Sequence, residues 1–262
     1  MLNCHSIFTN QAKFNPMSAL NRTILLLTFI SILFFGSCQS ENKVRPVAQK
    51  AQIGSTLFNQ ISAQKSGIFF KNPNSESQTN NLFTNNLVYG GGGVASGDLN
   101  DDGLPDIVFV SNEGIPGIYL NEGNFKFKAA IAGTGIGKTT GWQSGVSIID
   151  INLDGKMDIY INRGGTHVRN EADRGNLLYI NQGNMKFEDV SKKAGIESNK
   201  WSTGALMEDV NNDGFVAIYV CNSGPHQDVK TRTNQLYINN GNGTFTEQAQ
   251  KYNIADNSKS TQ

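Results

Sequence analysis

The sequence predicts an all-β protein built from a repeated unit of four strands, and three observations predict it. Glycine contributes 28 of the 262 residues and asparagine contributes even more, a composition typical of chains with many turns that need a positive φ. An acidic motif occurs three times, and a hairpin pattern follows each copy. The 22 basic and 22 acidic side chains balance, which excludes a strongly basic nucleic-acid-binding protein.

An apolar run near the amino terminus precedes the repeats. Residues 24–35 read ILLLTFISILFF and lie between Arg22 and the small residues before Cys38. The run is short for a membrane span, and it lacks the caps and partner of a buried helix. It is similar to a bacterial lipoprotein signal. We therefore expect residues 1–37 to be a signal peptide that starts at Met1 or Met17, and Cys38 to carry the lipid.

The expected mature chain begins with a polar tether at residues 38–52. Such a protein would be an outer-membrane lipoprotein of the cell envelope, with possible exposure at the cell surface. Cys221 is then the remaining thiol, and it lies in the apolar run IYVCN. We expect it to be a small buried hydrophobic side chain rather than a nucleophile or a disulfide partner.

The acidic motif has the pattern D-x-N-x-D-G-x-x-D. It runs from Asp98 to Asp106 and from Asp150 to Asp158, and a third copy from Asp209 ends at Ala217 without the last carboxylate. An apolar run follows each copy. The copies recur every 50 to 60 residues or so, a period typical of propeller blades or solenoid coils.

A hairpin pattern lies about twenty residues beyond each acidic motif. An alternating apolar run ends in Asn-x-Gly-Asn, and a phenylalanine opens the next strand, at Phe127, Phe187 and Phe245. Glycines precede each motif at the same spacing, at Gly93, Gly145 and Gly204. One unit is therefore strand, acidic loop, strand, hairpin and strand, which corresponds to a four-stranded propeller blade.

The spacing of oxygen-bearing residues in the motif predicts a Ca²⁺ site. Ca²⁺ takes six to eight oxygen ligands, which positions one, three, five, seven (by its carbonyl) and nine of a tight loop can supply. The candidate ligands are Asp98, Asn100, Asp102, Leu104 and Asp106; Asp150, Asn152, Asp154, Lys156 and Asp158; and Asp209, Asn211, Asp213 and Phe215. The alternative is that these residues form plain polar turns.

An EF-hand is a poor match to the motif. That loop needs a bidentate glutamate at position twelve and continues into a helix, but position twelve here is Phe109, Ile161 or Val220, inside strand-like runs. We expect the loops to join strands.

With these motifs, residues 53–262 resemble the FG-GAP/VCBS repeat family, the calcium-loop propeller repeats of integrin α-chains, and most closely bacterial lipoproteins grouped with cartilage acidic protein. The resemblance implies a β-propeller with a partial blade at 53–93 and repeats near 94–140, 141–200 and 201–262. It assigns Ca²⁺ binding to the aspartates and asparagine of the first two loops and, in the third loop, to Asp209, Asn211 and Asp213. Ala217 departs from the pattern, so a weaker third site is expected.

About three blades are expected, which is an incomplete ring because closed propellers use four to eight. The hairpin-to-loop spacing predicts a fourth acidic loop about five residues beyond Gln262. We therefore expect a truncated gene or the amino-terminal part of a longer protein. Remaining blades or other copies would then cover the open edges.

Residues 132–139, AGTGIGKT, fit a relaxed phosphate-loop pattern. A phosphate loop opens a helix, whereas the residues that follow here lead to the second acidic motif. Gly135-Ile136 also aligns with Gly195-Ile196 of the next repeat. We expect a connection between blades, with no nucleotide.

No catalytic set emerges from the sequence. His167 and His226 lie in polar segments without a nucleophile at a motif spacing, so solvated loop histidines are expected. The favoured function is a calcium-binding, surface-anchored binding or adhesion module for a protein or glycan, without activity of its own. The alternative is the non-catalytic propeller portion of a longer carbohydrate-processing or uptake protein.

Overall fold

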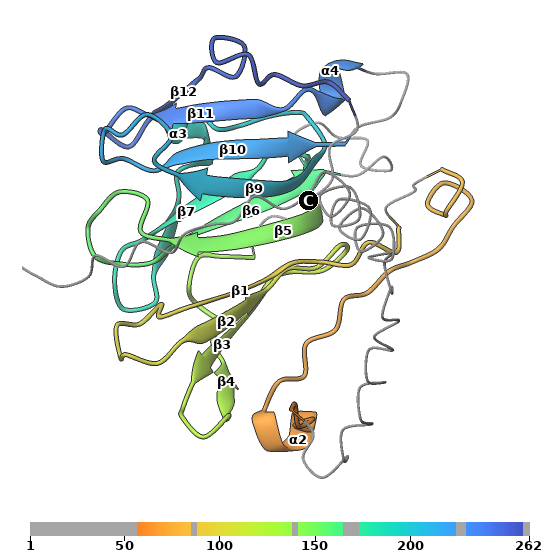
Figure 1. Ribbon diagram of the computed structural model, residues 1–262. Coiled ribbons are helices and arrows are strands. Elements are labelled where there is room, and N and C mark those ends of the chain that lie inside the picture. Colours follow the sequence, from red (N-terminus) through yellow and green to blue (C-terminus); the bar gives the residue numbers. More distant parts are fainter. Residues whose placement is uncertain (1–56, 85–87, 138–140, 165–172, 224–228, 259–262) are drawn as a thin grey trace, which may run out of the picture. The chain divides into compact units, whose positions relative to one another are not determined.

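The computed structural model describes residues 57–84, 88–137, 141–164, 173–223 and 229–258 (Figure 1). The predicted signal peptide, Cys38 and the tether lie outside these residues. The chain divides into two units, 1–59 and 60–262, and every sheet belongs to the second. None of the described helices has the length and apolar character needed to cross a bilayer.

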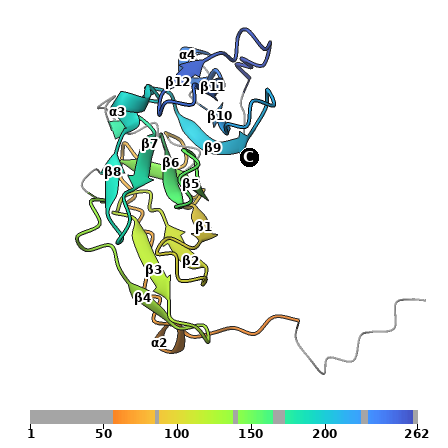
Figure 2. The same cartoon turned by 90° about the vertical axis from the view of Figure 1, so that its left-hand side faces the viewer.

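The described part of the chain forms three four-stranded antiparallel sheets, here called blades 1, 2 and 3. In each blade the strands follow one another in chain order, as Figure 2 shows from the side. Blade 1 comprises β1 (Val94–Gly97), β2 (Asp106–Phe109), β3 (Gly117–Asn121) and β4 (Phe127–Ala129); blade 2 comprises β5 (Trp142–Ile149), β6 (Asp158–Gly164), β7 (Leu177–Asn181) and β8 (Phe187–Asp189); blade 3 comprises β9 (Ser202–Glu208), β10 (Ala217–Asn222), β11 (Gln235–Asn239) and β12 (Phe245–Glu247). The predicted all-β fold with an incomplete set of blades is confirmed.

Strand β6 is buried on both faces because blade 2 packs against blade 1 on one face and blade 3 on the other. In β6, Ile159 and Ile161 join the apolar cluster between blades 1 and 2, whereas Tyr160 joins the cluster between blades 2 and 3. All three side chains are fully buried. This explains why the residues after the second acidic loop read as a continuous apolar run rather than an alternating one.

Glycines let the first strands of neighbouring blades approach closely. A Cβ added to Gly93 would lie 2.8 Å from Cα of Gly145, and a Cβ added to Gly145 would lie 3.4 Å from the carbonyl oxygen of Thr203 in blade 3. A larger residue at Gly93 would therefore force the backbones apart.

The connections that lead into the blades share a left-handed glycine. Gly67, Gly135 and Gly195 have φ values of 78°, 92° and 75°. A Cβ at Gly135 would lie 2.5 Å from the carbonyl oxygen of Phe187 in β8, so only glycine fits there. The segment 132–139 resembling a phosphate loop is thus a turn, described up to residue 137, and the chain resumes at 141 immediately before β5.

Short helices complete the fold. They are α2 (Ala63–Ser66), α3 (Ser191–Ala194) and α4 (Val229–Arg232). The sequence echo between residues 58–68 and 187–196 extends to the helical turn, since Gly67 and Gly195 cap α2 and α3 in the same way. It does not extend to the strand: Phe58 is 85% exposed outside any strand, whereas Phe187 opens β8 and is buried.

Candidate metal-binding loops

The three acidic loops share one backbone conformation. Their fourth residues, Asp101, Leu153 and Asn212, have φ near +60°, and the glycine at the sixth position has φ between +83° and +88° in each. The first aspartate accepts the amide N–H of that glycine, at 2.7 Å for Asp98 and 2.8 Å for Asp150 and Asp209. The third loop therefore folds like the others despite Ala217.

The fifth-position carboxylates stabilise the turn by accepting backbone N–H groups. Asp102 Oδ1 accepts the N–H of Leu104 at 2.8 Å, and Asp154 Oδ1 accepts the N–H of Lys156 at 2.9 Å. The Lys156 N–H is also the main cause that holds the pKa of Asp154 below its ordinary value. Lys156 Nζ lies 3.4 Å from Asp154 Oδ2, an exposed ion pair of small energetic value.

The ninth-position aspartates are buried in the strands that follow the loops. Asp106 and Asp158 open β2 and β6, and neither side chain is exposed. Asp158 Oδ2 accepts the N–H of Ile151 at 3.1 Å, and its Oδ1 accepts the N–H of Asn181 at 2.8 Å. Asp106 accepts the equivalent N–H groups of Leu99 and Asn121. Each aspartate thereby joins its loop to the hairpin of its own blade.

Burial shifts the titration of both groups. Burial raises the pKa of Asp158 to about 6, against the two N–H donors that lower it, and the charges of Asp154 and Asp150 raise it further. The pKa of Asp106 is also raised, first by burial and then by nearby Asp102 and Asp98. The carboxylates of each intact loop are therefore close enough to repel one another.

In the third loop, Ala217 replaces the buried carboxylate. It is itself buried, and its methyl group offers no acceptor to the N–H groups of Val210 and Asn239, which occupy the positions of Ile151 and Asn181. The amide N–H of Gly214 still holds the pKa of Asp209 below its ordinary value. Blade 3 thus keeps the loop conformation but lacks the buried carboxylate that joins the loop to the hairpin in the other two blades.

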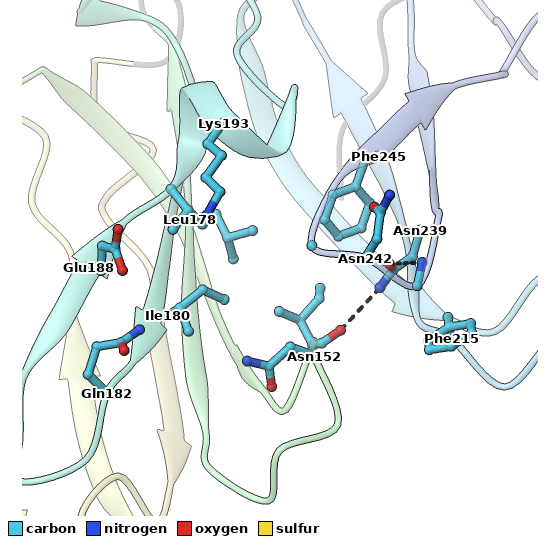
Figure 3. Close-up of a pocket in the computed structure, with 14 residues that line it drawn as sticks. Asn152, Leu178, Ile180, Gln182, Glu188, Lys193, Phe215, Asn239, Asn242 and Phe245 are labelled. Carbon is cyan, nitrogen blue, oxygen red and sulfur yellow. Dashed lines mark hydrogen bonds between the residues drawn. The ribbon is translucent and has the colours of Figure 1, made fainter.

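A buried asparagine of the next blade fastens each of the first two loops. Asn181 Nδ2 donates to the carbonyl oxygen of Leu99 at 2.9 Å, and Asn239 Nδ2 donates to that of Ile151 at 3.1 Å. Figure 3 shows the second of these bonds as the dashed line from Asn239. Each loop is therefore held between two blades.

The residues present fit a hard cation. Side-chain oxygens at positions one, three and five, with the seventh carbonyl, are the donors that Ca²⁺ prefers, and the mutual repulsion of the carboxylates favours a cation that relieves it. Among the described residues, no group of three or more His, Cys, Asp or Glu side chains is arranged so that these residues alone could hold a metal ion. The donor set of each loop instead mixes aspartate with asparagine and a backbone carbonyl.

The loops differ from EF-hand loops as the sequence predicts. Position twelve lies in a strand each time, since Phe109, Ile161 and Val220 belong to β2, β6 and β10. Each loop connects the first two antiparallel strands of its blade.

Comparison with known families agrees with this geometry. Residues 69–161 match the family model of the FG-GAP-like repeat. Residues 69–161 therefore contain an FG-GAP-like repeat. No curated protein matches the chain significantly. The matched stretch contains all of blade 1, both intact loops and the first strands of blade 2, so the FG-GAP-like repeat accounts for the part of the chain in which the loops are complete.

The contacts of Asn181 and Asn239 with the neighbouring blade were not predicted from the sequence. Both residues end a Leu-Tyr-Ile run, and both accept the N–H of the glycine two residues on, which is the turn function that their spacing indicates. The repetition of the same asparagine in a buried strand was an available sign of a further role. His167 and His226 lie outside the described residues.

Cys221 is half-buried in β10, and burial raises the pKa of its thiol. A raised pKa reduces the thiolate fraction. The environment therefore suits the expected small hydrophobic side chain.

Proposed function

We propose that this protein is a calcium-stabilised binding or adhesion module, held on the cell envelope by a lipid at Cys38 and without catalytic activity of its own. FG-GAP-like repeats form propeller modules that are often involved in binding or adhesion. The observation that carries the calcium part is the repetition of one loop conformation in three blades, with Asp, Asn and Asp at positions one, three and five of each loop.

Calcium would stabilise the fold for two reasons. An ion that binds only the folded loops raises the free energy of unfolding by mass action. It also offsets the repulsion between carboxylates that the folded loops hold together. Because each of the first two loops is fastened to the next blade, an ion there would stabilise two blades at once.

Thermal unfolding of the full chain tests the calcium proposal. A chelator should lower the melting temperature by several degrees, and added Ca²⁺ should restore it. Mg²⁺ should restore it poorly, because that ion requires a smaller octahedral cage and keeps several waters. A melting curve that does not respond to the chelator would leave the loops as plain polar turns.

The lipid anchor has its own test. Cys38→Ala should abolish labelling by a radioactive fatty acid, because it removes the thiol that carries the lipid. It should also release the protein from the membrane fraction, because the acyl chains contribute about 0.8 kcal/mol of membrane binding per buried CH₂. Cys221→Ala serves as the matched control and should leave both unchanged. Equal labelling of the Cys38→Ala variant would remove the anchor from the proposal.

A further inference from the structure

A pocket of about 190 Å³ opens at the interface between blades 2 and 3 (Figure 3). Leu178, Ile180 and Val190 line it from blade 2, and Phe245 lines it from blade 3. Its edge includes Asn152 of the second acidic loop. The pocket therefore combines apolar side chains from both blades with polar ones, and it lies beside a candidate metal site.

The pocket is lined by a glycine at the sequence position that holds an apolar side chain in the preceding repeat. The hairpin of blade 2 reads Gly-Asn-Met185-Lys-Phe, and that of blade 3 reads Gly-Asn-Gly243-Thr-Phe. Met185 packs against the apolar cluster between blades 1 and 2. A Cβ on Gly243 would meet no atom within 4 Å. The interface between blades 2 and 3 thus lacks an apolar side chain at the position that Met185 holds at the interface between blades 1 and 2.

The charged groups at the rim also change between the two interfaces. Between blades 1 and 2, Lys186 Nζ donates to the carbonyl oxygen of Gly133 at 2.6 Å. In the next repeat, threonine replaces this lysine and Lys193 replaces Gly133. Figure 3 shows Lys193 extending from α3 toward Leu178, and no described residue lies within ion-pair distance of it. Glu188 adds one carboxylate on the β8 side of the pocket.

We propose that this pocket binds one unbranched apolar side chain of a protein partner, with an acidic group of the same partner beside Lys193. Met185 shows which kind of side chain the equivalent space accepts. The volume suits a single group of this size, since a cavity of about 150 Å³ takes up benzene and drug-sized ligands need about 300 Å³ or more. The choice of a protein partner rests on the binding role proposed above; the pocket itself does not.

Methyl NMR of the full chain with N-acetylmethionine as the probe tests the proposal. The probe carries the thioether side chain and a carboxylate, and it should shift the methyl signals of Leu178, Ile180 and Val190 with saturation in the millimolar range. N-acetylglycine, which lacks the side chain, should not. Absence of saturable shifts at these methyl groups overturns the proposal.

Two exchanged variants locate the site. Gly243→Met should fill the pocket and abolish the shifts, because Met185 holds the equivalent sequence position at φ 56° and Gly243, at φ 79°, also has a left-handed backbone. Met185→Gly should create a second site, read from the methyl groups of Ile118 and Ile159. Binding that persists in a folded Gly243→Met variant overturns the proposal. If the Gly243→Met variant fails to fold, the Met185→Gly variant decides the question. If Met185→Gly does not gain a second binding site, the proposal is overturned.

Lys193→Ala should weaken the binding of N-acetylmethionine about two- to fivefold, which corresponds to the loss of an exposed ion pair. It should leave the binding of N-acetylmethionine amide unchanged, because the amide has no carboxylate. Lys192→Ala, an exposed neighbour on α3, is the matched control. An equal effect of both variants would contradict the role of Lys193. The N-acetylmethionine titration is repeated with a chelator present. Binding to the pocket can then be tested separately from the binding of calcium to the loops.

Discussion

Asn239, the last residue of β11 in blade 3, donates its side-chain amide to the carbonyl oxygen of Ile151, the second residue of the acidic loop in blade 2. Its side-chain oxygen accepts the N–H of Gly241 in its own hairpin turn at 3.0 Å. One side chain therefore fixes a turn in one blade and a loop in another. This bond couples the stability of the second loop to the packing of blade 3.

Asn239→Ala should lower the free energy of unfolding by about 1–3 kcal/mol, because it leaves a buried carbonyl without its donor. It should also weaken Ca²⁺ binding to the second loop. Urea unfolding and calorimetric titration measure the two effects. Asn240→Ala, at an exposed neighbour, is the control and should cost clearly less. Equal losses in the two variants would remove the special role of Asn239.

Calcium titration of the full chain should resolve two stronger sites and one weaker site. The weaker site belongs to the third loop, where Ala217 supplies neither charge nor oxygen. Ala217→Asp should strengthen it, since the new carboxylate can accept the N–H groups of Val210 and Asn239 as Asp158 accepts those of Ile151 and Asn181. Three equal sites in the unsubstituted protein would contradict this assignment.

The pH dependence of stability should reveal Asp158 when a chelator is present. Its pKa of about 6 in the folded chain lies above the ordinary value of 3.8, so the folded state holds the proton more tightly than the unfolded state. The stabilisation is complete below pH 3.8 or so and is lost as the pH rises through 6. Ca²⁺ should oppose this trend because it favours the ionised carboxylate.

Asp158→Asn provides the comparison for this measurement. The amide cannot titrate, so the difference in unfolding free energy between variant and parent should change between pH 4.5 or so and pH 7 in chelator. Urea unfolding at the two pH values measures it. A difference that stays constant would show that Asp158 titrates with its ordinary pKa.

Gly93→Ala should lower the free energy of unfolding by about 1–3 kcal/mol, the usual cost of forcing atoms into a packed contact. The new Cβ would lie 2.8 Å from backbone atoms of Gly145 and Val146, which cannot rotate away. Ser96→Ala, at an exposed position of β1, should change stability little. Thermal unfolding of the two variants is sufficient, and an unaffected Gly93→Ala variant would argue against close contact between β1 and β5.

The sequence by itself determined the four-stranded unit, the position of the acidic loops and the strands that flank them. These features depend on local chemistry: glycine at a positive φ, asparagine in a hairpin turn, and an apolar run after each loop. For this reason Gly103 and Gly155 occupy the predicted sharp turns, and Phe127 and Phe187 open the predicted strands.

Only the tertiary structure decided which partners these residues meet. Asp106 and Asp158 read from the sequence only as loop ligands, whereas the fold buries them and their carboxylates accept backbone N–H groups. Asn181 and Asn239 read as turn residues, yet each reaches a carbonyl in another blade. The replacement of Met185 by Gly243 becomes a pocket only when two blades pack. Such contacts join residues up to 88 positions apart, and local spacing carries no information on them.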